Sequence, residues 1–127
     1  MKFSEITSPD KLKRAITKEY CLICCGTSWS IPCRKQYSIL KRLAGEHSRW
    51  DCIAILDIER CPDAVTLWTI QSIPTTIVFS NGSEVGRLVG LKSYLKLHAA
   101  LNRIFPPGFA GQFSGPAETM QCGQSKV

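Results

Sequence analysis

Apolar residues in the first half of the chain follow two distinct patterns. Residues 20–25 and 52–56 are continuous apolar runs of strand length, which is typical of strands that are buried on both faces of a sheet. Between these runs, Tyr37, Leu40 and Leu43 recur at the spacing of one helix face. We therefore predict two parallel strands that are connected by a helix.

Helix signals also lie before the first strand and after the second. Ser8, Pro9 and Asp10 are typical of a helix start, because a serine caps the helix, a proline fits its first turn and a carboxylate favours its positive end. Pro62 opens a further short helix that is predicted to run to about Thr69. The predicted order of elements therefore begins with an extra N-terminal helix.

The pattern of the third part of the chain favours a hairpin. Residues 75–80 are rich in β-branched side chains, residues 81–82 are an Asn-Gly turn signal, and residues 84–89 form the returning strand. A final helix is predicted over residues 92–105. The chain is thus predicted to be an α/β protein, whose central mixed sheet is flanked by helices in the order α, β, α, β, α, β, β, α.

Length and composition fit a single domain. The chain has 127 residues, of which 44% are hydrophobic and 20% are charged, as in ordinary globular proteins. We assign residues 1–105 to the domain, and residues 106–127, with four Gly and three Pro, to a disordered tail. No apolar run approaches the roughly 20 residues that span a bilayer, and the N-terminus lacks the apolar region of a secretory signal. We therefore expect a cytoplasmic location and no membrane attachment.

The excess of positive charge is confined to the N-terminal part of the chain. Residues 1–50 contain ten Lys and Arg against four Asp and Glu, whereas residues 51–127 contain six of each. Two alternatives follow: a solvated helix face, or a docking surface for an acidic partner or a nucleic acid. Nucleic acid is not expected, because no aromatic residues interleave with the basic ones. The basic residues that share one helical face by their spacing are Arg34, Lys35, Lys41, Arg42 and Arg49.

The chain contains seven cysteines, an odd number, so at least one thiol has no partner within the chain. Most of them lie in or beside apolar stretches, where a free cysteine acts as a small hydrophobe, which argues against a secreted disulfide framework. Cys21 and Cys24 have Cys-x-x-Cys spacing, but residues three apart on a strand face opposite sides of the sheet. No second pair completes a zinc site, so no metal or cofactor is expected. The cysteines in apolar stretches are Cys21, Cys24, Cys25, Cys33 and Cys52.

Cys61 differs from these cysteines because it precedes a proline at a predicted helix start. Two interpretations remain open for it. It is either an exposed thiol that can be modified or an ordinary surface residue.

The segment Trp29-Ser30-Ile31-Pro32-Cys33 lies where the first long strand ends and the following helix begins. In a Cys-x-x-Cys pair at such a place, the exposed thiolate attacks a disulfide and the second thiol resolves the mixed intermediate. Ser30 occupies the attacking position here, and a hydroxyl cannot perform that step. Thiol chemistry at this segment therefore depends on Cys33 alone.

These motifs and their order resemble the thioredoxin family over about residues 5–105. Residues 29–33 are similar to the family's Trp-Cys-Gly-Pro-Cys, and residues 57–62 are similar to the segment that leads into its next helix. The resemblance implies the thioredoxin fold. A third match follows the family's cis-proline strand, hairpin and groove glycine in register, in Ser72-Ile73-Pro74-Thr75, Val78-Phe79, Asn81-Gly82 and Val89-Gly90.

In the family, the cis-proline and the residue before it line a groove that takes a substrate strand through backbone hydrogen bonds. The resemblance implies a cis bond between Ile73 and Pro74, the alternative being a plain turn proline. It also implies a protein or peptide partner, which would carry a disulfide if the redox function is retained. The expected groove residues are Trp29, Ile31, Pro32, Ile73, Pro74 and Gly90.

Two departures from the family accompany the match. The family's attacking cysteine corresponds to Ser30, and its buried carboxylate and neighbouring lysine correspond to Cys24 and Ile55. A buried acid helps to move the proton of the second thiol, which matters only while the exchange reaction runs. Because a lone buried charge is costly, replacement of both partners is physically coherent.

The roles of the remaining residues stay open at this level. Ser30 is either the N-cap of the following helix or an engineered replacement of a cysteine. Cys33 is either a reactive thiol, favoured by the helix N-terminus, or a shielded and inert one. Cys24 points toward Cys33 if it occupies the position of the buried acid, and a disulfide between the two is then one hypothesis. A Cα separation beyond about 7 Å, or Cβ vectors that diverge, would exclude it.

Two functions follow from these alternatives. The first is a thiol–disulfide redox protein, a weak oxidoreductase limited to one-thiol exchange through Cys33 and resolved by an external thiol. The second is a non-catalytic binding module that uses the groove and the basic helix to hold a protein partner. A monomer is expected in either case.

Overall fold

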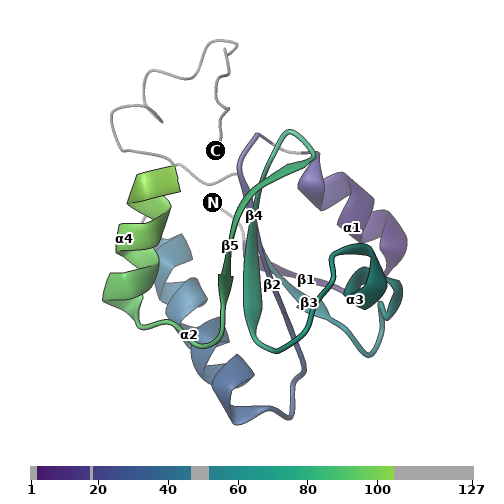
Figure 1. Ribbon diagram of the computed structural model, residues 1–127, viewed down its shortest axis with the longest axis horizontal. Helices are drawn as coiled ribbons and strands as arrows, with labels where there is room; N and C mark the ends of the chain where they lie inside the picture. Colours follow the sequence, from purple (N-terminus) through teal and green to yellow (C-terminus); the bar gives the residue numbers. More distant parts are fainter. Residues whose placement is uncertain (1–2, 18, 47–51, 105–127) are drawn as a thin grey trace.

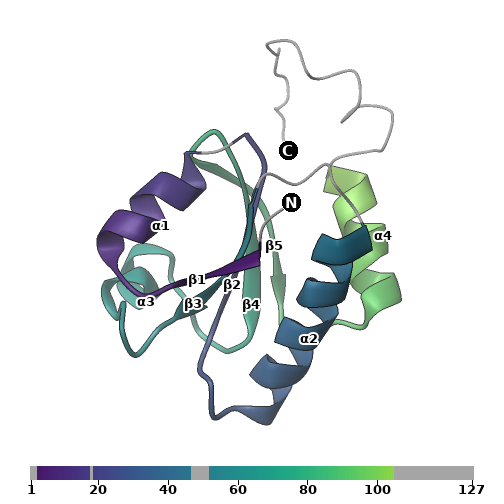
Figure 2. The same cartoon turned by 180° about the vertical axis from the view of Figure 1, so that it is seen from behind.

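The computed structural model describes residues 3–17, 19–46 and 52–104. A five-stranded sheet in the order β1-β3-β2-β4-β5 forms its centre (Figure 1). Helices α1 and α3 cover one face of the sheet, and α2 and α4 cover the other (Figure 2). The strands are β1 (Phe3–Ile6), β2 (Cys21–Gly26), β3 (Cys52–Asp57), β4 (Thr75–Ser80) and β5 (Ser83–Val89), and the helices are α1 (Pro9–Ile16), α2 (Ile31–Glu46), α3 (Asp63–Leu67) and α4 (Tyr94–Ile104).

The strand directions confirm the predicted mixed sheet. Strands β1, β3 and β2 are parallel, and β4 is antiparallel to both β2 and β5. Asn81 and Gly82 form the predicted turn between β4 and β5 with positive φ angles of 52° and 89°, a conformation that these two residue types tolerate best. The order of elements from α1 to α4 also matches the prediction.

The predicted start of the chain is wrong in one respect. The structure places strand β1 before helix α1 and pairs it with the outer side of β3. This edge strand has only four residues, and its central residues Ser4 and Glu5 are exposed. A segment this short and polar carries too little alternation to be distinguished from a loop. Helix α1 itself begins as predicted, because the side chain of Ser8 accepts a hydrogen bond from the backbone N–H of Lys11 at 3.3 Å.

Successive residues of β2 belong to different cores, because strand side chains alternate between the two faces. Cys21, Ile23 and Cys25 are buried with α1 and α3, whereas Leu22 and Cys24 are buried with α2 and α4. Cys21 and Cys24 therefore lie on opposite faces, and their Cys-x-x-Cys spacing does not make a pair. This confirms the prediction for this motif.

Some predictions lie outside the described residues, namely the tail 106–127 and Arg49 of the basic helix face. Among the helices that the structure does describe, none combines the length and the apolar character needed to cross a membrane.

Candidate thiol site and groove

Ser30 begins helix α2 as its N-cap. Its side-chain oxygen accepts a hydrogen bond from the backbone N–H of Cys33 at 3.4 Å, and its carbonyl accepts one from the N–H of Arg34 at 3.0 Å. These bonds satisfy donors that the first helical turn would otherwise leave free. The Ser30 hydroxyl, which occupies the family's attacking position, thus caps helix α2.

Cys33 lies in the first turn of α2 with its side chain turned into the protein. The residue is 0% exposed. Its sulfur occupies the space beside Gly26 at the end of β2, where an added Cβ would lie only 2.5 Å from Sγ. Because a nucleophilic thiolate must reach its target sulfur, this position corresponds to the shielded alternative.

The hydroxyl of Tyr37 lies in the same small space, one helical turn beyond Cys33. A Cβ on Gly26 would lie 2.7 Å from this oxygen. The oxygen is buried and has no hydrogen-bond partner within the described part of the chain. Burial, with the thiols of Cys24 and Cys33 nearby, raises the pKa of Tyr37 well above its usual range. The absence of a side chain at Gly26 therefore makes room for both the thiol and the phenol, and the phenol stays neutral.

Cys24 and Ile55 are direct register partners on β2 and β3, so the two positions of the family's acid and lysine do meet. Cys24 is 0% exposed. Burial raises the pKa of its thiol to about 12, although a hydrogen bond with the side chain of Thr76 acts in the opposite direction and Cys33 raises it slightly further. The thiol is therefore protonated at neutral pH. A neutral group paired with an aliphatic one needs no charge partner in this core.

The proposed Cys24–Cys33 disulfide remains a hypothesis. Both residues are free thiols in the structure. Cys33 lies near enough to Cys24 to contribute to the raised pKa of that thiol.

The peptide bond between Ile73 and Pro74 is cis. The carbonyl of Pro74 accepts a hydrogen bond from the N–H of Gly90 at 2.8 Å, which brings two expected groove residues together. Cys25 at the end of β2 pairs with Thr75 at the start of β4. The loop that carries Trp29 and the segment that carries Pro74 therefore lie at the same edge of the sheet.

The expected groove residues from the α2 side are open to solvent. Trp29 is 65% exposed and Ile31 is 58% exposed, and Pro32 is exposed as well. The indole N–H of Trp29 donates a hydrogen bond to a carboxylate oxygen of Glu59 at 3.0 Å, which orients the ring. Two large apolar side chains are thus presented at the surface.

Gln36 is a site residue that the sequence analysis missed. Its side chain is 0% exposed and clamps the backbone of Lys92, accepting from the N–H at 2.8 Å and donating to the carbonyl at 3.2 Å. The clamp ties α2 to the segment that follows Gly90. A polar residue on the buried stripe of a helix was the available signal, since Cys33, Gln36, Leu40 and Leu43 are the buried positions of α2.

The basic face of α2 is partly occupied by contacts within the protein. Arg42 pairs with Glu46 at 3.3 Å, and its guanidinium lies 4.0 Å from the centre of the Tyr94 ring on α4. The hydroxyl of Tyr94 donates a hydrogen bond to the same carboxylate. Arg42 therefore stabilises the contact between the two helices, while Arg34 and Lys35 remain exposed near the helix start.

Both interpretations of Cys61 are wrong, because the residue is only 5% exposed. It turns inward at the start of α3, in the core beneath α1, rather than onto the surface. Burial raises the pKa of its thiol, and the carboxylates of Asp57 and Asp63 raise it further. The proline after it gave a correct helix start but carried no information about which way the thiol points.

The described residues contain no group of three or more His, Cys, Asp or Glu side chains that could hold a metal ion.

Comparison with known proteins agrees with the fold and with the resemblance to the thioredoxin family. The family model for thioredoxin matches residues 4–103. Thioredoxin from Chlamydia muridarum is 35% identical over 88 residues, which cover 69% of this chain and 85% of that protein. Thioredoxin from Echinococcus granulosus is 33% identical over 82 residues, covering 64% of this chain and 76% of that protein.

Solved structures show the same architecture. A mutant thioredoxin from Halobacterium salinarum superposes with a TM-score of 0.71 over 80% of this chain and 89% of that chain, at 18% identity. Thioredoxin from Malassezia sympodialis gives a TM-score of 0.70 at 21% identity, over 80% of this chain and 90% of that chain. At this level of identity the likeness concerns the fold alone.

Proposed function

The chain belongs to the thioredoxin family of redox proteins, and from this premise we propose that it is a binding member of the family. In this proposal, the groove beside Ile73 and Pro74 holds an extended segment of a protein partner. No disulfide is turned over by a pair of cysteines. The observation that carries the proposal is that Cys33 is 0% exposed while Trp29 and Ile31, in the same segment, are 65% and 58% exposed.

The buried thiol argues against turnover. Exchange requires a thiolate that can approach the partner's disulfide along the axis of its S–S bond. Ser30 cannot form the first bond, and its hydroxyl is already engaged with the N–H of Cys33. Cys33 is enclosed by Gly26 and Tyr37. A reaction through Cys33 would require the first turn of α2 to open.

The exposed groove residues support binding. Large aromatic and aliphatic side chains at the surface are typical anchors of protein interfaces. Val89 and Leu91, on either side of Gly90, are also exposed, at 54% and 41%. The same sheet edge thus offers apolar contacts from the α2 side and from the β5 side.

A second candidate function is one-thiol exchange through Cys33. Its position in the first turn of α2 favours it, because the positive end of a helix stabilises a thiolate. The thiolate of Cys33 would attack one sulfur of the partner's disulfide and release the other as a thiolate. An external thiol such as glutathione would then form a disulfide with the partner's sulfur and return Cys33 as a thiol.

For either candidate we propose a cytoplasmic, monomeric protein. The support for the location is that the six cysteines in the described part of the chain are buried free thiols rather than members of a disulfide framework.

The rate of insulin reduction by dithiothreitol separates the two functions. We expect wild type and Cys33→Ala to give equal rates near the uncatalysed background. A rate for wild type clearly above that of Cys33→Ala would establish the second candidate instead. Ser30→Cys shows whether the rest of the site still supports turnover.

Binding is tested by capture of partner proteins with matched surface variants. Ile31→Asp places a charge in the groove, and Leu67→Asp places the same charge on α3, where the side chain is 71% exposed. We expect partners of the wild type to be retained by Cys33→Ala and Leu67→Asp and lost by Ile31→Asp. Loss of all partners with Cys33→Ala would contradict the binding proposal.

A further inference from the structure

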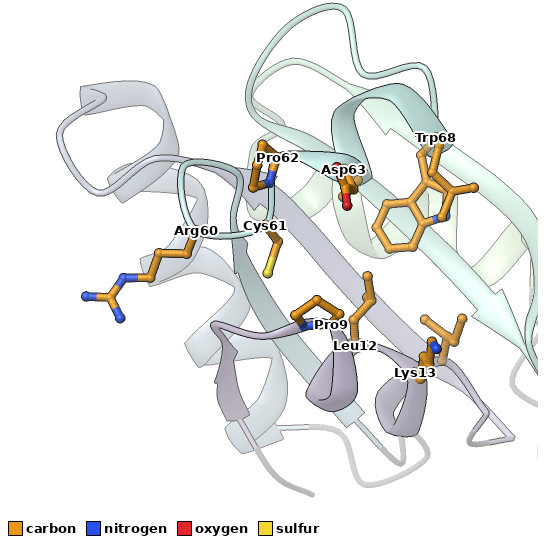
Figure 3. Close-up of a pocket in the computed structure, with 11 residues that line it drawn as sticks. Pro9, Leu12, Lys13, Arg60, Cys61, Pro62, Asp63 and Trp68 are labelled. Atoms are coloured by element: carbon orange, nitrogen blue, oxygen red, sulfur yellow. The ribbon is translucent and has the colours of Figure 1, made fainter.

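A pocket lies between α1 and α3, on the face of the sheet opposite to α2 (Figure 3). Its volume is about 290 Å³. Most of its wall is apolar and comes from Leu12 and Ile16 on α1 and from Ala64, Leu67 and Trp68 on or beside α3. The pocket is therefore separate from Cys33 and from the groove.

The volume limits the size of an occupant. A cavity of about 150 Å³ lined by apolar side chains holds one benzene molecule, and pockets for drug-sized ligands begin at about 300 Å³. A pocket of about 290 Å³ thus suits a molecule with one or two fused rings. A dinucleotide or a long acyl chain would not fit.

Trp68 gives the pocket a rigid aromatic wall. Its ring packs against Phe79 of β4, with the two ring centres 5.0 Å apart. Figure 3 shows the indole on one side of the pocket, across from Pro9 and Leu12 of α1. A flat aromatic molecule can therefore stack or make edge contacts with the indole without displacing it.

The charges around the pocket balance one another. Lys13 from α1 and Asp63 from α3 contribute one positive and one negative side chain to its wall. Arg60 also contributes, but its guanidinium points away from the pocket in Figure 3 and lies 3.8 Å from a carboxylate oxygen of Asp57. The surroundings thus favour neither a cation nor an anion.

Cys61 supplies the polarisable group of the pocket. Its sulfur points toward Pro9 and Leu12 (Figure 3), and the residue is 5% exposed. Burial and the carboxylates of Asp57 and Asp63 raise its pKa, so the thiol stays protonated and is a weak nucleophile at neutral pH. This favours reversible binding over covalent attachment.

We propose that the pocket between α1 and α3 binds a neutral aromatic molecule of one or two fused rings, in contact with Trp68, Leu12 and the thiol of Cys61. This site is independent of the proposed groove function.

The test uses three probes that share the 1-naphthylmethyl group and differ in charge: neutral 1-naphthalenemethanol, cationic 1-naphthylmethylamine and the anion of 1-naphthaleneacetic acid. Binding is followed by ¹H–¹⁵N NMR of the whole chain. We expect the alcohol to shift the amide signals of Ala64, Leu67 and Trp68, with a dissociation constant below about 1 mM, and to leave those of Trp29 and Ile73 unchanged. The two charged probes should bind at least about threefold more weakly, because each must lose hydration without gaining net charge complementarity.

Variants test the volume of the pocket and the balance of its charges separately. Ala64→Leu adds three carbon atoms at the pocket wall and should weaken the alcohol at least about tenfold, which corresponds to the lost burial of about two methylene groups of the ligand at about 0.8 kcal/mol each. Asp63→Asn should favour the acetate and Lys13→Gln the amine, with Asp10→Asn as a control for total charge. Circular dichroism confirms that each variant is folded.

The proposal is overturned if the alcohol leaves the α3 signals unchanged at its solubility limit. It is also overturned if either charged probe binds wild type more tightly than the alcohol, or if folded Ala64→Leu binds the alcohol as well as wild type does.

Discussion

The two sides of the α2 N-terminus differ in accessibility. On the inner side, Cys33 and Cys24 are 0% exposed, and burial keeps the thiol of Cys24 neutral with a raised pKa. On the outer side, Trp29 and Ile31 are mostly exposed. The side chains that can react are enclosed, whereas those that can contact a partner are open. Within residues 29–33, the thiol is thus enclosed while two large apolar side chains are exposed.

At neutral pH, the largest expected effect comes from filling the space beside Cys33. In Gly26→Ala, the new Cβ would lie 2.5 Å from Sγ of Cys33 and 2.7 Å from the hydroxyl of Tyr37. Overpacking of this kind costs about 1–3 kcal/mol. Urea denaturation measures the loss.

A matched control for this variant is Gly45→Ala on α2, where no atom lies within 4 Å of the added Cβ. It should stabilise the helix by about 0.5–1 kcal/mol. If Gly26→Ala and Gly45→Ala change the free energy of unfolding by the same small amount, the space beside Cys33 is not tightly packed. The double variant Gly26→Ala/Tyr37→Phe should recover part of the loss.

The second prediction concerns alkaline pH. The pKa of Cys24 is raised from 9.0 to about 12 in the folded protein, so between these values the unfolded chain releases a proton that the folded chain keeps. The stability linked to this thiol is complete below pH 9 and is lost as pH rises toward 12, by up to about 1.4 kcal/mol per pH unit. Urea midpoints across this window should fall less steeply in Cys24→Val. Equal slopes would show that Cys24 is not a buried neutral thiol.

The third prediction concerns the clamp by which Gln36 on α2 holds the backbone of Lys92. Gln36→Leu keeps the buried volume but leaves the N–H and the carbonyl of Lys92 without their partner. Loss of a buried hydrogen-bond partner costs about 1–3 kcal/mol, reduced here because Lys92 is half-buried. NMR amide signals of Gly90 and Leu91 should move as well. An unchanged stability with unmoved signals would show that the clamp does not position the segment that contains Gly90 and Leu91.

The smallest expected effect is at Ser30. Replacing an N-cap serine by alanine typically costs about 1 kcal/mol, so Ser30→Ala should lower the urea midpoint. Asparagine, a comparable N-cap, should restore it in Ser30→Asn. If alanine and serine give equal midpoints, the hydroxyl does not cap α2.

Much of the fold follows from the sequence because its signals are local. The continuous apolar runs, the Asn81-Gly82 turn and the Ser8 cap each predicted an element that the structure contains. Strand β1 was missed, because four residues at a sheet edge owe their conformation to pairing with β3 and not to a pattern of their own.

The site was less predictable, because side-chain direction depends on contacts distant in sequence. The resemblance to the thioredoxin family implied that Cys24 and Ile55 lie on neighbouring strands, and the structure pairs them in register. The space beside Gly26 that Tyr37 shares with Cys33, and the inward turn of Cys61, arise from packing between elements. No local pattern in the sequence marks them.

The most direct test of the central claim is the rate at which iodoacetamide alkylates Cys33 in the native protein, measured by peptide mass spectrometry. A sulfur that is 0% exposed reacts only when the protein opens. We therefore predict a rate that is at least about a hundredfold below that in urea, and that rises in variants of lower stability. A native rate close to that of the unfolded chain would contradict the claim that this thiol is enclosed.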